Sequence, residues 1–280
     1  MSEAVRVGPV VVGGGAPLVL IAGPCVIESR DAALRHAERL RAIAAAAGLP
    51  LVYKSSFDKA NRTAIDAFRG PGLEEGLSIL AEVRQATGLP VLTDVHDQTQ
   101  IAPVAEVADV LQTPAFLCRQ TDFILAVARA GKPVNLKKGQ FLSPEEMEQV
   151  VRKARSTGNH ALLVTERGFA FGYRNLVADF RALQILAATG CPVVFDATHS
   201  VQHPGGQGTA SGGDRRFVAP LARAAVAAGV DAVFLEVHED PDRARSDGAT
   251  SVPLDTLPAL LRQLADIDRA LRTEAYAHAR

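Results

Sequence analysis

Short hydrophobic runs alternate with longer segments of helical spacing along most of the chain. Eight runs are apolar on both faces and lead into polar or ionisable residues: PLVLIAGPC, LPLVYKSS, LPVLTDVH, ADVLQTPAF, KPVNLKKGQ, HALLVTERG, CPVVFDATH and DAVFLEVHED. A run that is apolar on both faces is typical of a parallel strand covered by helices. We therefore predict a parallel strand for each run.

The segments between the runs predict amphipathic helices, for example over residues 31–47, 73–87, 144–156, 176–189 and 218–228. Ser143 followed by a proline predicts the start of one helix. Three joints, AAAGLP, QATGLP and AATGCP, end a helix with glycine and lead through proline into the next run. This repeated joint indicates a repeated βα unit.

Eight βα units in a chain of 280 residues favour an α/β fold, a single (β/α)₈ barrel over residues 1–280. Residues 1–17 are expected to form a hairpin that plugs the bottom of the barrel, and residues 273–280 a tail. A doubly wound open sheet is the competing architecture, but GPC after the first run is not the glycine-rich fingerprint of that fold.

Composition narrows the class of protein further. The chain is 48% hydrophobic and has a net charge of −1, which does not suggest a protein that binds nucleic acid or a membrane surface. No apolar run reaches the roughly 18–20 residues of a membrane span, and the first residues do not resemble a signal peptide. We expect a soluble, cytoplasmic protein. Its three cysteines are few and far apart, which indicates thiols rather than a disulfide framework.

Polar residues at the carboxyl ends of the strands are expected to converge at one mouth of the barrel. Taken singly, each has a simpler interpretation, since a strand-end lysine is often solvated and a strand-end aspartate often caps the next helix. Eight polar strand ends at one mouth favour a functional site there.

Ten motifs in the chain resemble those of the 3-deoxy-D-manno-octulosonate 8-phosphate synthases, also called 2-dehydro-3-deoxyphosphooctonate aldolases: AGPCVIES, KSSFDKANR, FRGPGLEEGL, TDVHD, QTPAFLCRQTD, KKGQF, TERG, FGYRNLVADFR, DATHSVQ and ASGG. The resemblance extends from about Leu18 to Leu264. It implies a barrel enzyme, usually a homotetramer, of Kdo and lipopolysaccharide biosynthesis. Such an enzyme condenses phosphoenolpyruvate with D-arabinose 5-phosphate and water, and releases the eight-carbon sugar phosphate and inorganic phosphate.

The resemblance also implies a role for particular residues. Phosphoenolpyruvate would be held by Lys54, Ser56, Lys59, Gln112, the backbone of Ala115, Lys137 and Arg167, and the pentose phosphate by Asn61, Arg62, Thr63, Asp94 and Phe116. Arg62 would reach into the site of a neighbouring subunit, and Gln202 would contribute to a glycine-rich cover over the site. Such a set of cations is chemically reasonable, because two phosphates and a carboxylate enter one cavity.

For the reaction itself, the resemblance implies that Lys137 stabilises developing negative charge and that Asn61 belongs to the catalytic set. Asp94 and His96 are candidates for positioning and proton transfer, and the sequence does not assign the acid and the base.

The family has metal-free members, which carry asparagine where Cys25 stands and proline where Gly139 stands. This chain therefore resembles the metal-dependent members, in which the matching ligands would be Cys25, His199, Glu236 and Asp247. A thiolate, an imidazole and two carboxylates suit Zn²⁺, Fe²⁺ or Mn²⁺, and the pattern does not choose among them. The simpler interpretation of Cys25 is a small buried thiol.

Two alternatives stay open. A 3-deoxy-D-arabino-heptulosonate 7-phosphate synthase would share the barrel but use erythrose 4-phosphate. It typically shows a KPRTS-like stretch where this chain has KANRT. A barrel kept only for binding or regulation would have lost a strand-end lysine or part of the metal set, and nothing is missing here.

Overall fold

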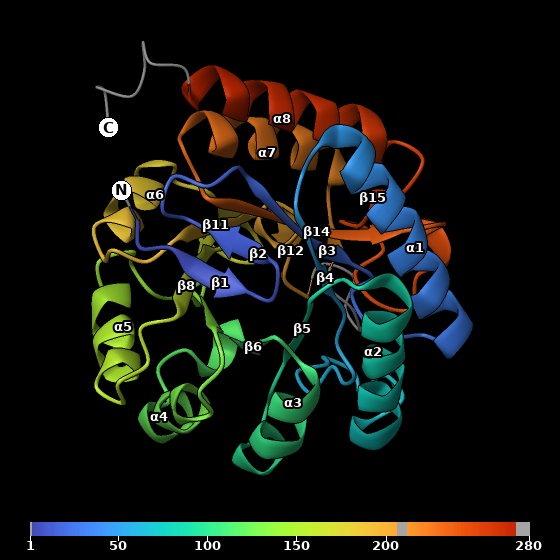
Figure 1. Ribbon diagram of the computed structural model, residues 1–280, viewed down its shortest axis with the longest axis horizontal. Helices are drawn as coiled ribbons and strands as arrows, with labels where there is room; N and C mark the ends of the chain where they lie inside the picture. Colours follow the sequence, from blue (N-terminus) through green and yellow to red (C-terminus); the bar gives the residue numbers. More distant parts are fainter. Residues whose placement is uncertain (1, 206–211, 273–280) are drawn as a thin grey trace.

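The computed structural model describes residues 2–205 and 212–272. Its centre is a closed ring of eight parallel strands (Figure 1): β3 (Val19–Gly23), β4 (Leu51–Lys54), β5 (Val91–Asp94), β6 (Val110–Thr113), β7 (Val134–Lys137), β8 (Leu162–Glu166), β11 (Val193–Asp196) and β14 (Ala232–His238). Each strand pairs with the next, and β14 closes the ring by pairing with both β11 and β3. The predicted (β/α)₈ barrel is confirmed, and each of the eight runs contains one of its strands.

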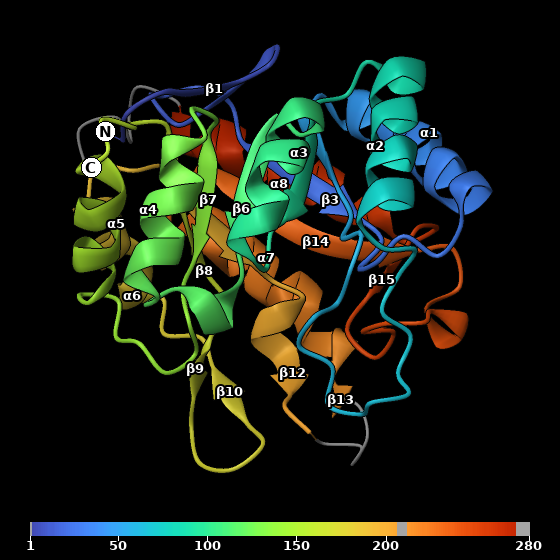
Figure 2. The same ribbon diagram turned by 90° about the horizontal axis from the view of Figure 1, so that it is seen from below.

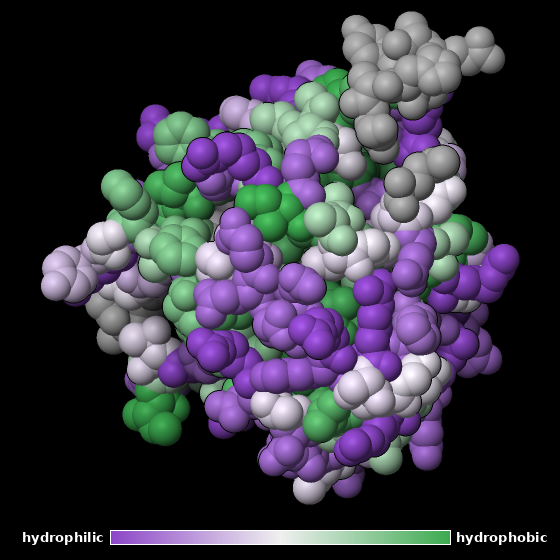
Figure 3. Space-filling view, turned by 90° about the vertical axis from the view of Figure 1, so that its left-hand side faces the viewer, coloured by the Kyte–Doolittle hydropathy of each residue, from purple (hydrophilic) through white to green (hydrophobic). Residues whose placement is uncertain are grey.

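Helices surround the ring: α1 (Arg30–Ala47), α2 (Leu73–Thr87), α3 (Ile101–Val107), α4 (Thr121–Arg129), α5 (Met147–Arg155), α6 (Arg181–Ala187), α7 (Val218–Ala227) and α8 (Leu257–Arg272). Their apolar faces pack on the outside of the strands and form the larger hydrophobic core. The face over α4, α5 and α6 is largely hydrophilic, with hydrophobic residues in small groups (Figure 3). No helix within the described residues is long and apolar enough to cross a membrane.

An N-terminal hairpin of β1 (Val5–Val7) and β2 (Val10–Val12) covers one end of the barrel. Its four buried valines pack against barrel residues that include Ile21, Val194 and Phe234. The hairpin therefore closes the end opposite the loops that carry β9, β10, β12 and β13, as Figure 2 shows. This confirms the predicted plug and leaves the carboxyl ends of the strands as the open mouth.

Two helix predictions need correction. The helix expected over 176–189 spans only Arg181–Ala187, because Leu176–Val177 (β10) pairs with Phe169–Ala170 (β9) in an antiparallel hairpin. The helix expected from 144 begins at Met147, after hydrogen-bonded turns. The Glu146 side chain accepts a hydrogen bond from the Ser143 backbone N–H, which is one half of a capping box.

Three further short strands lie in the loops at the mouth. These are β12 (Gln202–His203), which pairs with β13 (Gly212–Gly213), and β15 (Val252–Pro253), which extends the sheet beside β14. The glycine-rich cover expected after strand β11 falls partly on residues 206–211, and the tail on 273–280. Both segments lie outside the described residues.

His36 of α1 is buried and has a partner for each ring nitrogen. Its Nδ1 lies 2.7 Å from the Ala32 carbonyl oxygen, and its Nε2 accepts a hydrogen bond from the Glu239 backbone N–H at 3.2 Å. This arrangement fits the neutral ring with the proton on Nδ1. Burial lowers the pKa of His36, and the nearby His238 lowers it further. His36 is thus a structural link between α1 and the end of β14.

Candidate functional site

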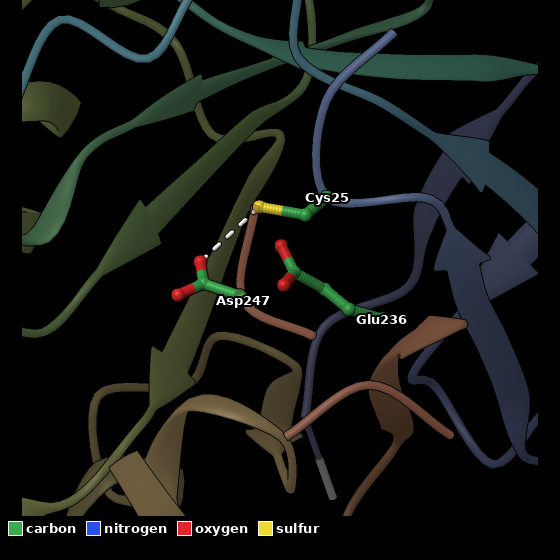
Figure 4. A group of neighbouring side chains, drawn as sticks. All are labelled: Cys25, Glu236 and Asp247. Atoms are coloured by element: carbon green, nitrogen blue, oxygen red, sulfur yellow. Dashed lines mark hydrogen bonds between the residues drawn. The ribbon is translucent and has the colours of Figure 1, made fainter. Parts of the chain in front are cut away.

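Three ligand-type side chains converge where β14 meets β3. Cys25 lies two residues after the end of β3, Glu236 lies in β14 opposite Gly23, and Asp247 lies in the loop after β14. Their ligand atoms all lie within 4.8 Å of one another, and the side chains point toward each other in Figure 4. The Cys25 Sγ lies 3.1 Å from Asp247 Oδ2. A Cβ at Gly23 would lie only 1.9 Å from the Lys54 carbonyl oxygen, so this close approach of β3 and β4 requires glycine.

His199 flanks this cluster. Its Nε2 lies 3.5 Å from Glu236 Oε1 and 3.9 Å from Asp247 Oδ2. Both carboxylate oxygens of the fully buried Glu236 lack a hydrogen-bond partner among the described residues. Buried carboxylate oxygens without a hydrogen bond need other compensation, and a divalent cation can supply it. The donor set of one thiol, one imidazole and two carboxylates fits such a cation.

The protein environment shifts the pKa values of two candidate ligands, Cys25 and Asp247. Burial, and then the nearby Glu236, raise the pKa of the Cys25 thiol well above its usual value, so the thiol is neutral. Burial alone would raise the pKa of Asp247, but His199 and then Lys59 bring it below its ordinary value. Since a coordinating thiol is deprotonated by the ion, binding of a divalent cation would release the Cys25 proton.

Beside the cluster lies a cavity of about 750 Å³. The residues predicted to hold substrates line it, with the exception of Ser56: Lys54, Lys59, Asn61, Arg62, Thr63, Asp94, Gln112, Ala115, Phe116, Lys137, Arg167 and Gln202. His96, His199 and Asp247 line the same cavity. The structure thus brings together residues from the ends of four barrel strands and from the segments that follow six of them. The candidate cation ligands border the space where a substrate would lie.

Four cationic side chains give this cavity its charge. Lys54, Lys59, Lys137 and Arg167 are each at most 9% exposed. Burial lowers the pKa of Lys137 despite the attraction of Asp196, and burial also lowers the pKa of Arg167. Burial opposes the charge of Lys59, but the surrounding acidic groups, Glu236 among them, raise its pKa above its usual value. Buried, preorganised cations of this kind favour phosphate and carboxylate ligands.

Neighbouring side chains fix the polar groups of the cavity. Arg167 donates to the Gln202 side-chain oxygen at 2.7 Å. The Gln112 side-chain oxygen accepts a hydrogen bond from Asn135, whose own oxygen accepts one from Thr165. These bonds hold Arg167 and Gln112 in place before any ligand binds.

Asp94 and His96 form a pair at the end of β5. The His96 Nε2 lies 2.9 Å from Asp94 Oδ2, and the Ser56 hydroxyl donates to Asp94 Oδ1 at 2.5 Å. Burial would raise the pKa of Asp94, but Lys54 and the hydrogen bond from His96 hold it well below its usual range. Asp94 is therefore an anion that orients His96 against the cavity. Ser56 lies beneath the cavity and supports this pair.

The loop after β4 is pinned at its base and carries the predicted pentose-phosphate residues. The Lys59 backbone N–H donates to the Arg69 carbonyl at 2.7 Å. The Arg62 guanidinium donates to the Phe68 and Arg245 carbonyls of the same chain. Arg62 thus lines the cavity of its own chain, and its expected reach into a neighbouring subunit stays a prediction.

Sequence analysis assigned no role to two residues at this site. The Cys25 thiol donates to the buried Ser246 hydroxyl at 2.8 Å, and Asp196 contacts both Lys137 and His199. Asp196 could have been identified as a site residue from the sequence, since a charged residue ends an apolar run three positions before His199. Ser246 carried none beyond its position next to Asp247.

The fold and this cavity define a (β/α)₈ barrel suited to strongly anionic small molecules beside a divalent-cation centre. A family model for the DAHP synthetase I family matches residues 2–273. The chain is 58% identical over 272 residues to a 2-dehydro-3-deoxyphosphooctonate aldolase of Trichlorobacter lovleyi, covering 97% of this chain and all of that protein. Relatives with the same name from Geobacter metallireducens and Methylococcus capsulatus are 59% and 62% identical, covering 97% and 91% of this chain and 100% and 90% of those proteins.

The chain therefore belongs to the DAHP synthetase I family and, within it, to the 2-dehydro-3-deoxyphosphooctonate aldolases. The family predicted from the motifs is confirmed. The three relatives share the octonate name, which does not favour the heptulosonate alternative.

Proposed function

We propose that this chain is a 3-deoxy-D-manno-octulosonate 8-phosphate synthase, which joins phosphoenolpyruvate to D-arabinose 5-phosphate in Kdo biosynthesis. The proposal rests above all on the cavity that collects Lys54, Lys59, Lys137 and Arg167 around one space. Relatives that share 57–62% of their residues with it carry the corresponding name.

In this reaction the enol carbon of phosphoenolpyruvate attacks the aldehyde carbon of the pentose, and water adds to the carbon that bears the phosphate. The C–O bond to phosphate then breaks. The water gives up both of its protons, one to the former aldehyde oxygen and one to the departing phosphate, and its oxygen becomes the new ketone oxygen. We assign the phosphoenolpyruvate anion to Lys54, Lys59, Lys137 and Arg167, with Gln112 and the Ala115 backbone as polar contacts and Ser56 supporting them from below. Because these cations are fixed before binding, they stabilise developing negative charge without reorganisation.

The pentose phosphate is assigned to the loop after β4 and the residues that face it: Asn61, Arg62, Thr63, Asp94 and Phe116. Asn61 lines the cavity and is our candidate for the catalytic set in this loop. The Asp94–His96 pair is the candidate for holding and moving a proton, because the carboxylate orients the ring at 2.9 Å.

A divalent cation, Zn²⁺, Fe²⁺ or Mn²⁺, is assigned to Cys25, His199, Glu236 and Asp247. When bound, such a cation supplies Lewis acidity to an oxygen of substrate or water. The support is the donor set itself and the two Glu236 oxygens that have no hydrogen bond within residues 2–205 and 212–272.

We further propose a cytoplasmic homotetramer. Its support is the exposed apolar surface of the β9–β10 hairpin, where Phe171 is 70% exposed and Tyr173 is fully exposed. Large exposed aromatic residues that lie together mark interaction surfaces. Sedimentation of the wild-type protein and of a Phe171→Ser, Tyr173→Ser variant tests this. A wild-type tetramer that shifts to smaller species in the variant supports the assignment, and a wild-type protein smaller than a tetramer contradicts it.

Phosphate release tests the enzyme assignment directly. Purified protein is given phosphoenolpyruvate with arabinose 5-phosphate or erythrose 4-phosphate, each with and without a chelator. Turnover of the pentose alone, lost with chelator and restored by a divalent ion, is the expected result. Preference for the tetrose would refute the substrate assignment, and pentose turnover that survives the chelator would refute only the metal assignment.

A further inference from the structure

The carboxylate of Asp196 lies between the candidate cation ligands and the cavity that is lined by lysines and Arg167. None of the roles proposed above is assigned to it. Asp196 ends β11 and is fully buried. Its Oδ2 lies 2.6 Å from Lys137 Nζ and 2.7 Å from His199 Nδ1. One oxygen atom therefore touches a residue from each of the two sites.

The other oxygen of Asp196 fixes the turn that carries His199. Asp196 Oδ1 accepts hydrogen bonds from the Thr198 hydroxyl at 3.0 Å and from the His199 backbone N–H at 2.9 Å. The Thr198 hydroxyl in turn accepts one from the Glu236 backbone N–H at 3.2 Å. Asp196 is thus linked to two of the four candidate ligands through short, buried contacts.

These contacts have a consequence for each site. With Nδ1 of His199 facing Asp196, the ring presents Nε2 to Glu236 and Asp247, and a ligating histidine commonly depends on such a carboxylate for its orientation. On the other side, Lys137 is held with its Nζ 4.3 Å from the centre of the Phe234 ring, at the wall of the cavity.

The other strand-end carboxylates that are not candidate ligands do not make this double contact. Asp94 faces the cavity and holds His96 and Ser56. Glu166 accepts hydrogen bonds from the backbone N–H groups of Arg167 and Gly168. Glu236 contacts His199, Lys54 and Lys59, but it is itself a candidate ligand. Among the described strand-end carboxylates outside the ligand set, Asp196 is the one that contacts both a candidate ligand and a substrate-binding lysine.

We propose that Asp196 is a positioning residue shared by the two sites: it sets His199 for a divalent cation and Lys137 for the phosphoenolpyruvate anion. The affinities for two ligands of opposite charge then depend on one side chain. This inference rests on the proposed function, because that function supplies the identity of the anion.

Two binding measurements on metal-free protein test it without any turnover. Co²⁺ binding is followed by absorption, in which the thiolate-to-cobalt band reports Cys25. Phosphoenolpyruvate binding is followed by calorimetry. Asp196→Asn keeps the shape of the side chain but replaces the carboxylate, which faces Lys137 and His199 in the wild type, with a neutral amide. We expect its dissociation constant for Co²⁺ to rise about 10–100-fold. We expect its dissociation constant for phosphoenolpyruvate to rise about tenfold, because one charge-assisted contact is lost.

Asp266→Asn, on the exposed surface of α8, is the matched control, and neither affinity should change. A folded Asp196→Asn protein in which either affinity stays within twofold of wild type overturns the inference. If Asp196→Asn does not fold, Thr198→Val replaces it, because it removes no charge but only the hydroxyl that links Asp196 to the Glu236 backbone N–H. Both constants should then rise together, roughly fivefold, and a change in only one overturns the inference.

The two proposals fail in different ways. Wild-type protein that does not bind phosphoenolpyruvate refutes the proposed function, and this inference falls with it. Wild-type protein that binds both ligands, with a variant that loses only one, refutes the shared role of Asp196 and leaves the proposed function intact.

Discussion

Glu236 is the buried charge whose removal should cost the most stability. The side chain is fully buried, and its Oε1 lies 3.5 Å from Lys54 Nζ and 3.8 Å from Lys59 Nζ. Glu236→Gln keeps the size and shape of the side chain but leaves these two ammonium groups without their nearest carboxylate. The effect of the substitution therefore measures the charge and not the packing.

The distances set the expected magnitude. At an effective dielectric constant of about 20, each of the two contacts corresponds to roughly 4–5 kcal/mol of attraction. Dehydration of the carboxylate offsets several kcal/mol of that sum, and breaking a buried ion pair typically costs about 3–5 kcal/mol. We expect the free energy of unfolding to fall by this amount and the melting temperature by roughly 6–15 °C.

The assay is urea and thermal unfolding of both proteins in chelator at one protein concentration, so that neither a bound cation nor assembly contributes to the difference. Glu74→Gln, exposed in the first turn of α2, is the control and should change stability by less than about 1 kcal/mol. A Glu236→Gln protein as stable as wild type would refute the reasoning, since dehydration of the carboxylate would then cancel its attraction to the lysines.

Three further predictions follow from the same structure. Cys25→Ala should abolish chelator-sensitive activity and the thiolate-to-cobalt band. Cys191 is a buried thiol outside the cluster, and Cys191→Ala should keep both. Full activity of Cys25→Ala in chelator would contradict the metal assignment. Because the pKa of His36 is lowered by burial, its neutral form stabilises the fold and the free energy of unfolding should decline as the pH drops below about 6.5. His36→Gln should flatten this slope in melts between pH 5.5 and 7.5, and an unchanged slope would exclude His36 as its source. A Cβ at Gly139 would lie 2.9 Å from Cys118 Sγ and 3.0 Å from the Ala115 carbonyl oxygen. Gly139→Ala should therefore cost about 1–3 kcal/mol of stability and raise KM for phosphoenolpyruvate. An unchanged KM would show that the backbone at Ala115 does not depend on this packing.

Local patterns determined the architecture. Each strand of the barrel lies within a hydrophobic run of a few residues, and glycines such as Gly48 and Gly88 end helices in the left-handed conformation at the repeated joints. These features are encoded by neighbours along the chain, so the periodicity reveals them. The pattern gave a wrong prediction where pairing with another segment decides the structure. Leu176–Val177 has helical spacing but forms a strand that pairs with β9.

The residue types of the site were also visible in the sequence, because the fold places the ends of strands at one mouth and the motifs name the candidates. Their mutual contacts were not. Cys25 and Asp247 are separated by 222 positions, and Lys137 meets Asp196 only because β7, β8 and β11 are neighbours in the closed ring. Arg62 turns toward its own cavity because carbonyls of Phe68 and Arg245 lie within reach.

The sequence by itself therefore determined the eight barrel strands, the approximate positions of the helices between them and the list of residues able to bind anions and a cation. The tertiary structure alone decided which of them touch, which are buried and which, like Asp196, serve two sites at once. The physical reason is that hydrophobic periodicity acts between residues a few positions apart. Charge pairing and pKa depend on distances of 3–4 Å across strands that only the closure of the barrel brings together.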